Sequence, residues 1–213
     1  MIYIIITTSI INNHGLQHNK HSVQNNIHRQ NRYIESITQL LELVKNDPDI
    51  KPIIVENNGY RETYLNNFKC DICYTNNNIN RYIHKGENEL LDIKEVINQY
   101  KIQDDDIVIK LTGRYKLLNS NFIDLVKTKK TDCDAFVKFF NVCTKKFMFD
   151  DCVLGLFAIK CKYLKDFKYS FVKSPECEFA SYVRKNIHNE KLIEVQQLDL
   201  ECCFADDLRI LVV

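Results

Sequence analysis

Tryptophan is absent from this chain of 213 residues, and there are only five glycines and three prolines. The sequence contains no internal repeat and no segment rich in glycine, serine or proline that would separate two domains. With 45% hydrophobic residues, a chain of this length can bury a substantial core. We therefore expect one folded unit, residues 1–213, whose parts share one continuous sheet.

Long apolar runs are also missing. The longest, such as Ile2 to Ile6, fall far short of the roughly 20 residues that cross a bilayer. The N-terminus lacks the basic, apolar and small-residue pattern of a signal peptide. We expect no membrane span and a cytoplasmic protein.

Neither sign of charge dominates. The 29 Lys and Arg residues are balanced by 28 Asp and Glu residues, with no long run of one sign, so we expect no nucleic acid partner. Only Lys160 to Lys173 mixes basic and aromatic residues in the way that nucleic-acid-binding surfaces do. Nine cysteines, an odd number in a chain that can build its own core, favour reduced thiols over a disulfide framework.

In the first half of the chain, short apolar segments alternate with helical patterns. We expect helices at Tyr33–Val44, after a polar segment that spans residues 12–31, and from Gly86 onward. Alternating strands and helices predict an α/β fold with a mostly parallel sheet, whose ligands bind outside the carboxyl ends of the strands. The predicted strands are Tyr3–Thr8, Ile53–Val55, Asp71–Tyr74 and Ile107–Leu111. The residues expected along one rim at their ends are Thr7, Glu56, Asn76 and Arg114.

The pattern changes beyond Lys130 and predicts a mixed second part. We expect strands at Ala135–Phe140 and Leu154–Ile159, a helix at Pro175–Lys185 and a final strand at Leu208–Val213. The apolar character of that last run also leads us to expect the first module of a longer polypeptide.

The most informative segment is the strand that runs into Thr112-Gly113-Arg114-Tyr115. A guanidinium group binds phosphate oxygens through two donors and stays charged at any working pH, so Arg114 is a candidate phosphate ligand. Gly113 would let the backbone approach a ligand closely. The alternative is an ordinary turn in which Arg114 pairs with a neighbouring carboxylate.

Taken in order, these patterns resemble the GT-A class of nucleotide-sugar glycosyltransferases over nearly the whole chain. The resemblance implies a Rossmann-like, mixed and mostly parallel central sheet flanked by helices. It also implies that residues 1–118 bind the nucleotide and that residues 119–213 form the acceptor side. By the same resemblance, Thr7 and Thr8 hold the nucleotide, and Glu56 and Asn57 lie near its base.

The segment that begins Lys85-Gly86 resembles the loop and helix start below the donor in that class, where a cation and a small residue approach the nucleotide. The fourth strand of the class usually ends in an Asp-x-Asp motif that binds a divalent metal, Mn or Mg, and the diphosphate. Here the corresponding residues are Thr112-Gly113-Arg114, so the sequence does not decide whether the protein needs a divalent metal. Lys110, Arg114 and Lys85 are the cations that could stabilise the leaving diphosphate instead.

On the acceptor side, Leu154–Lys160 resembles the acceptor-side strand of the class, and Ser174–Phe179 resembles its acidic helix start. Glu176 and Glu178 are therefore the catalytic candidates. They are two apart and diverge on a helix, so we expect only one, Glu176 before Glu178, to face the acceptor. Acids after Pro175 are equally ordinary at a helix start. The residues leave inversion and retention open, since a carboxylate base is needed only for inversion.

The sequence from Ile109 to Tyr115, IKLTGRY, resembles the corresponding segment in a subset of viral and bacterial glycosyltransferases. This subset includes the N-terminal domains of chlorovirus enzymes that act on capsid protein. The resemblance implies a viral protein that carries a sugar, a hexose or a deoxyhexose such as rhamnose, from a UDP-sugar to a glycan or glycoprotein hydroxyl in the host cytoplasm. The alternative is a catalytically silent binding module of a larger polypeptide. A sugar nucleotidylyltransferase is disfavoured, because Thr7 to Ile11 contains no Gly-rich phosphate loop.

Several other patterns have simpler interpretations. Arg29 and Arg32 precede the first predicted helix, where they could reach phosphate, but exposed basic residues beside a helix usually face solvent, so we rank both below Arg114. The polar segment 12–31 contains His14, His18 and His21. We expect it to form a polar loop over the nucleotide rather than a zinc site. The Asp-x-Asp string at Asp104–Asp106 precedes its strand, so it is expected away from the ligand rim. The string at Asp132–Asp134 also precedes a strand, although an irregular second part could bring it inward to bind a metal, which is the less favoured alternative.

Overall fold

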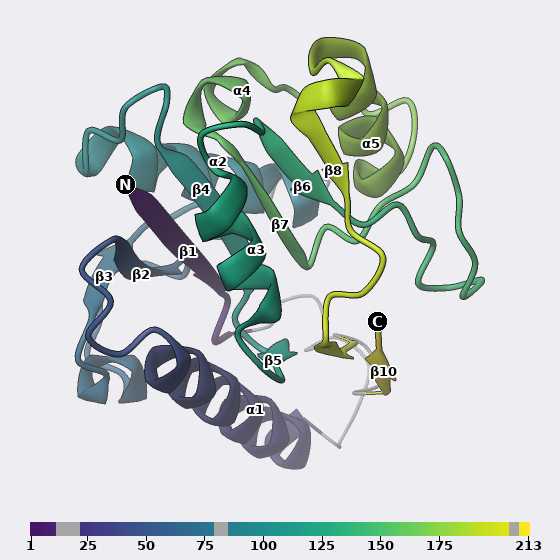
Figure 1. Cartoon of the computed structure of the whole chain (residues 1–213). Coiled ribbons are helices and arrows are strands. Elements are labelled where there is room, and N and C mark those ends of the chain that lie inside the picture. The colour runs from purple at the N-terminus through teal and green to yellow at the C-terminus, as the bar shows by residue number, and fades with distance from the viewer. Residues whose placement is uncertain (12–21, 79–84, 205–208) are drawn as a thin grey trace.

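The computed structural model is built around a seven-stranded sheet with the order β3-β2-β1-β4-β7-β6-β8 (Figure 1). The structure describes residues 1–11, 22–78, 85–204 and 209–213. Strand β7 is antiparallel to its neighbours β4 and β6, and the other pairings are parallel. The strands are β1 (Ile2–Thr8), β2 (Ile50–Glu56), β3 (Asp71–Tyr74), β4 (Ile107–Thr112), β6 (Ala135–Val137), β7 (Leu156–Lys160) and β8 (Leu192–Glu194).

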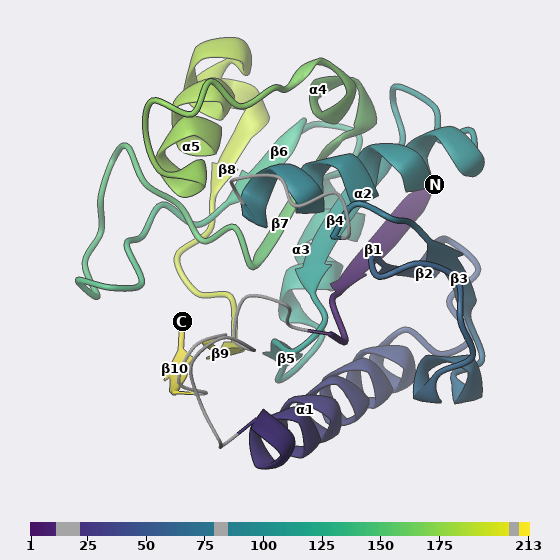
Figure 2. The same cartoon turned by 180° about the vertical axis from the view of Figure 1, so that it is seen from behind.

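Helices cover both faces of this sheet. Figure 1 shows α3 in front of the strands, and Figure 2 shows α2 in front of them from behind. The apolar side chains of α1 and α3 pack in one core cluster, and those of α2, α4 and α5 pack in the other. The helices are α1 (Ser22–Leu43), α2 (Lys85–Gln99), α3 (Asn121–Lys129), α4 (Cys161–Asp166) and α5 (Pro175–Asn186), with 3-10 turns η1 (Tyr64–Asn67) and η2 (Asn189–Lys191).

A second, three-stranded sheet contains β5 (Lys116–Leu117), β9 (Leu200–Cys203) and β10 (Ile210–Val212). The predicted final strand therefore forms, but it pairs with β9 and not with the central sheet. Strand β5 follows directly after the Thr112–Tyr115 turn, so this small sheet lies beside the carboxyl end of β4 (Figure 1).

The alternation of side chains along β1 determines what each face of the sheet presents. Ile4 and Ile6 pack in the cluster of α1 and α3, whereas Ile5 packs in the cluster of α2. Side chains two apart on a strand share a face, so Thr7 lies on the α2 face with Ile5. The register pairs Ile5 with Lys110, which places that lysine on the α2 face as well.

The mixed, mostly parallel sheet flanked by helices confirms the predicted fold class, and the parallel part includes β1 to β4 as expected. The start of the first helix was predicted wrongly: α1 begins at Ser22, not at Tyr33. Residues 22–32 are mostly polar, so they show no apolar stripe of their own. The sequence also gave no clear signal for α3, which carries Phe122, Ile123 and Val126 into the core.

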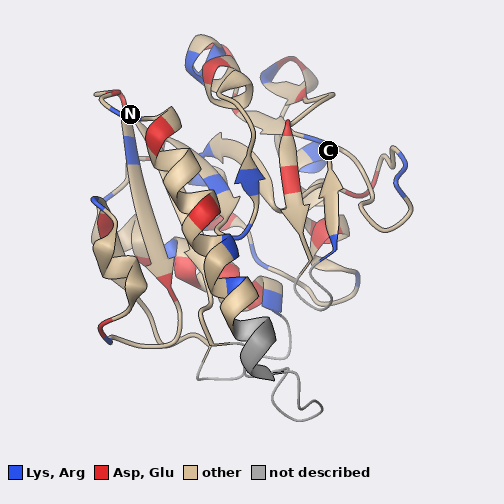
Figure 3. Ribbon diagram, turned by 90° about the horizontal axis from the view of Figure 1, so that it is seen from below, with Lys and Arg blue, Asp and Glu red and all other residues tan. Residues whose placement is uncertain are grey.

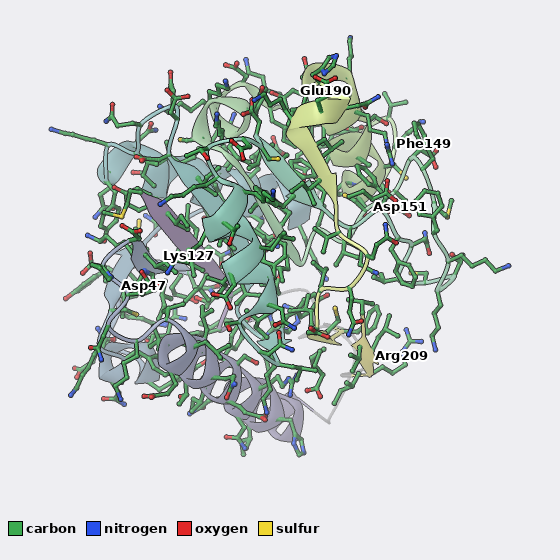
Figure 4. The ribbon with its side chains drawn as sticks, viewed as in Figure 1. Asp47, Lys127, Phe149, Asp151, Glu190 and Arg209 are labelled. Carbon is green, nitrogen blue, oxygen red and sulfur yellow. The ribbon has the colours of Figure 1, made fainter. Side chains whose placement is uncertain are left out.

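Charged residues of both signs are spread over the ribbon in Figure 3, with no large face of one sign in that view. Where opposite charges meet, they join elements that are distant in sequence. Asp47, after α1, forms an ion pair with Lys127 of α3, and Figure 4 shows the two side chains beside each other. In the part of the chain that the structure describes, no helix is long and apolar enough to cross a bilayer.

Candidate active site

A cavity of about 460 Å³ lies at the carboxyl ends of β1 and β4, on the face covered by α2. This is the position that the parallel strands predict for a ligand. Its charged lining is mixed. The basic residues are Arg29, Lys85, Lys110 and Arg114, and the acidic residues are Glu89, Asp92 and Glu176.

Lys110 lines the cavity from β4. Its side chain is only 1% exposed, and its Nζ lies 2.9 Å from Glu89 Oε1 of α2. The ammonium also donates to Thr112 Oγ1 and to the Leu154 carbonyl, both at 2.7 Å. Glu89 accepts a further hydrogen bond from Thr7 Oγ1 at 2.5 Å. One ion pair therefore joins α2 to the ends of β1 and β4.

The charges of this pair depend on each other. Burial lowers the pKa of Lys110, and the adjacent Glu89 carboxylate opposes that decrease. Burial raises the pKa of Glu89, but the charge and hydrogen bond of Lys110, with the hydrogen bond from Thr7, outweigh it and lower the pKa overall. Each charge therefore favours the charged form of its partner.

Asp92 makes a second connection one helical turn further along α2. Its carboxylate accepts hydrogen bonds from Asn57 Nδ2 at 3.0 Å, from Thr75 Oγ1 at 2.6 Å and from Asn77 Nδ2 at 2.7 Å. Burial raises the pKa of Asp92 to about 6, although these three donors oppose the increase. Because Asn57 follows β2 and Thr75 follows β3, Asp92 ties α2 to the strands beyond β1.

The start of α2 meets the start of α5 at the other side of the cavity. A Cβ on Gly86 would lie 2.9 Å from Pro175, so a larger side chain here would push the two helices apart. Ser174 caps α5, with its Oγ accepting from the Cys177 N–H at 3.3 Å. This close approach places Glu176, in the first turn of α5, on the cavity wall.

Gly113 serves packing and does not line the cavity. Its N–H donates to the Thr7 carbonyl at 2.9 Å, and a Cβ would lie 2.9 Å from Thr8 Cγ2. The close approach of backbone that the structure shows at Gly113 is to β1. The next residue, Arg114, does line the cavity, with Nε donating to the Cys203 carbonyl at 2.9 Å.

Arg29 lines the cavity, although its sequence position favoured solvent exposure over contact with phosphate. It lies within α1 and is 7% exposed, so the favoured expectation is wrong. Nε and Nη2 donate to the Ser9 carbonyl, and Nη2 also donates to Tyr33 Oη. Nη1 is buried without a hydrogen-bond partner among the described residues. Arg29, Tyr33 and Ile37 are four apart, so extending the apolar stripe backward would have placed Arg29 on the buried face.

Two other predicted residues lie outside the cavity lining. Glu56 is fully buried and accepts hydrogen bonds from Thr8, Asn58 and the Ile10 N–H, so it supports the strand ends and has no exposed oxygen for a base. Glu178 accepts from the backbone N–H groups of Ser170, Val172 and Lys173. Although burial raises its pKa, these bonds lower the pKa of Glu178 to about 2 overall.

The remaining predicted residues come together as one cavity wall. Those that line it are Thr7, Thr8, Asn57, Lys85, Gly86, Lys110, Thr112, Arg114 and Glu176. Asn76, expected on the rim, is exposed and outside the lining, whereas Asn78 is part of it. The histidines predicted to cover the nucleotide, His14, His18 and His21, lie outside the described residues.

Solved structures share this fold. No protein-family model matches the chain, and no curated protein matches its sequence. A protein of Desulfovibrio desulfuricans G20 described as a nucleotide-diphospho-sugar transferase has a TM-score of 0.55 at 8% identity, over 91% of this chain and 79% of its own. The mannosyltransferase PcManGT of Pyrobaculum calidifontis, in complex with GDP-Man and Mn²⁺, has a TM-score of 0.55 at 9% identity. The match covers 91% of this chain and 54% of the mannosyltransferase chain. The chain thus spans about half of that enzyme.

The same fold also occurs in a nucleotidylyltransferase. A Bacillus anthracis protein described as a glucose-1-phosphate thymidylyltransferase has a TM-score of 0.51 at 11% identity, over 92% of this chain and 86% of its own. The chain therefore has the fold of nucleotide-sugar transferases. At these identities the comparison concerns the fold, and the chemistry has to be argued from the cavity.

Removing one partner of the Glu89–Lys110 pair is expected to destabilise the protein strongly. Glu89→Met leaves the Lys110 ammonium buried without its counter-ion, and we expect a loss of about 3 kcal/mol in the free energy of unfolding. Glu89→Met/Lys110→Met should lose less than the two single variants together. Urea unfolding measures the free energy of each variant. Lys127→Met, which breaks the more exposed pair with Asp47, is the control and should cost much less stability than Glu89→Met. Additive losses would contradict the coupling.

Asp92→Asn is expected to change how stability depends on pH. The pKa of Asp92 rises from 3.8 to about 6 on folding, so between these values the folded protein holds a proton that the unfolded chain has lost. The free energy of unfolding of the wild type should therefore fall with rising pH by about 1.4 kcal/mol per unit relative to Asp92→Asn, and level off above about pH 6. Urea titrations from about pH 4 to 7 measure this difference, and parallel profiles would refute the assignment.

Proposed function

We propose that this protein transfers a sugar from a nucleotide-sugar donor, a UDP-sugar, to a hydroxyl group of a glycan or glycoprotein. The carrying observation is that one cavity at the strand ends combines Arg29, Lys85 and Arg114 with the carboxylate of Glu176. Its volume of about 460 Å³ is in the usual range for small-molecule sites. The fold shared with nucleotide-sugar transferases supports this proposal.

The order of strands suggests how the donor lies. Asp92 and Asn57 line the side of the cavity next to β2 and β3, and we propose that the nucleoside binds there. Asn88, one turn before Asp92, is 4% exposed and its Oδ1 has no hydrogen-bond partner in the described structure. A base that donates a hydrogen bond, such as uracil through its ring N–H, supplies the missing donor.

In this orientation, the diphosphate lies toward β4 and the sugar toward α5. Arg114 would hold phosphate oxygens on which negative charge increases as the bond to the sugar breaks. We propose that the Glu176 carboxylate takes the proton from the acceptor hydroxyl. The acceptor oxygen then bonds to the anomeric carbon, and the electron pair of the broken carbon–oxygen bond leaves with the diphosphate. This assignment corresponds to inversion of the anomeric centre.

The finer substrate identity rests on the resemblance of Ile109–Tyr115 to viral glycosyltransferases. On that basis we propose a hexose or a deoxyhexose such as rhamnose as the donor sugar, and a capsid glycan in the host cytoplasm as the acceptor. The second candidate function is a catalytically silent nucleotide-sugar-binding module. It is favoured by one observation, the replacement of Asp-x-Asp by Thr112-Gly113-Arg114 at the end of β4.

Nucleotide binding is expected to raise the melting temperature selectively. UDP and UDP-sugars should stabilise the protein by mass action, with smaller effects of GDP and CMP, and Arg114→Ala should reduce the UDP shift because it removes a phosphate ligand. Thermal unfolding with each nucleotide, in the presence and absence of manganese, measures this. Lys127→Met, far from the cavity lining, is the control. No shift with any nucleotide would refute donor binding.

Glu176→Gln is expected to lower the rate of sugar transfer by about 100-fold or more while UDP binding stays unchanged, because the amide cannot accept the acceptor proton. Release of UDP from a panel of UDP-sugars, with and without glycan acceptors, measures turnover. Glu178→Gln lies in the same helical turn but outside the cavity, so its rate should stay close to that of the wild type. Equal rates for Glu176→Gln and the wild type would indicate retention without this base, and binding without any turnover would indicate the silent module.

A further inference from the structure

We infer that the diphosphate of the donor is neutralised in this cavity by the guanidinium groups of Arg29 and Arg114, in place of a divalent metal. The inference rests on the proposed function, since it concerns the same cavity and the same ligand. It differs from what the fold implies, because a mannosyltransferase with this fold is in complex with GDP-Man and Mn²⁺.

The acids of the cavity do not form a suitable set of metal ligands. Across residues 1–11, 22–78, 85–204 and 209–213, no three His, Cys, Asp or Glu side chains are grouped so that they could hold a metal ion. Glu89 is already paired with Lys110 at 2.9 Å, and a divalent cation on that carboxylate would be repelled by the ammonium group. Asp92 already accepts three hydrogen bonds.

The residue types after β4 have also changed in a consistent direction. A metal-binding carboxylate is expected at the end of this strand, and the chain has Thr112-Gly113-Arg114 there. Thr112 accepts a hydrogen bond from Lys110, and Gly113 packs on β1, so Arg114 is the residue of this turn that carries charge into the cavity. A positive side chain thus occupies the position of a carboxylate whose usual role is to bring a positive ion.

Arg29 provides the independent observation. The residue is 7% exposed and forms no ion pair with any described residue, while Nε and Nη2 donate to the Ser9 carbonyl. Nη1 remains buried without a hydrogen-bond acceptor. A buried charged donor without an acceptor is costly, so the arrangement calls for an anionic group inside the cavity. The two bonds to Ser9 fix the direction of the guanidinium before any ligand arrives.

Arg29, Tyr33 and Arg114 line the same cavity. Arg29 Nη2 donates to Tyr33 Oη at 3.2 Å. Two guanidinium groups in one cavity repel each other, and a diphosphate bound to both would turn that repulsion into two attractive contacts. Each guanidinium can donate two parallel hydrogen bonds to phosphate oxygens. The pair therefore supplies the positive charge that a divalent ion supplies elsewhere.

The test is isothermal titration of the full chain with UDP and with UMP, once with excess EDTA and once with excess MnCl₂. We expect UDP to bind equally well in both conditions and more tightly than UMP. Arg29→Gln should weaken UDP about 10- to 100-fold in both conditions and leave UMP unchanged, which also shows that the variant is folded. Arg29→Lys should restore part of the loss, and Arg184→Gln, an arginine outside the cavity lining, should bind UDP like the wild type.

Each outcome separates this inference from the function on which it rests. UDP binding that requires MnCl₂ would overturn the inference and leave the proposed donor intact. UDP binding that is independent of metal but unaffected by Arg29→Gln would overturn the role of Arg29. Binding of no nucleotide in either condition would overturn the proposed function itself. Metal-independent UDP binding that Arg29→Gln and Arg114→Ala both weaken would support the inference.

Discussion

The arrangement of the cavity depends on the buried ion pair between Lys110 and Glu89. Burying an ammonium group is costly unless each of its donors has an acceptor, and Lys110 has three: the Glu89 carboxylate, the Thr112 hydroxyl and the Leu154 carbonyl. These acceptors belong to α2, to the end of β4 and to the segment before β7. The requirement to satisfy one charge therefore determines how three elements meet at the cavity.

Much of the polar chemistry at the strand ends has a structural role. Glu56, Glu89 and Asp92 accept hydrogen bonds from their neighbours, so the cavity is held before a ligand binds. In the described part of the cavity, two buried side-chain atoms have no hydrogen-bond partner: Arg29 Nη1 and Asn88 Oδ1. One is a cationic donor and the other is a neutral acceptor. A nucleoside diphosphate carries groups that complement both.

Periodicity in the sequence was sufficient for most of the central sheet. The apolar runs of β1, β2, β3 and β4 and the stripe of α2 are strong local signals, and their alternation determines the parallel part of the fold. Weak or short elements were missed for the same reason. Strand β5 has two residues and β8 has three, too few to show a period, and they form because their partners are already in place.

The site was harder to predict, because the role of a charged residue depends on partners that are distant in sequence. Glu89 and Asp92 resemble ordinary helix-surface acids until Lys110 and Thr75 are placed beside them. Glu178 looks like a second catalytic acid, but the loop before α5 occupies its carboxylate. For Arg29, the information was present in the four-residue spacing to Tyr33, yet the polar residues around it concealed the helix.

The antiparallel strand β7 lies between β4 and β6, and it therefore covers what would otherwise be an open edge of the sheet. All six residues of β4 are buried, so without β7 the chain would expose a flat apolar strand with unpaired backbone groups, which is a template for aggregation. Residues 1–118 contain β1 to β4 but not β7. The second half of the chain therefore also protects the first half from self-association through that edge.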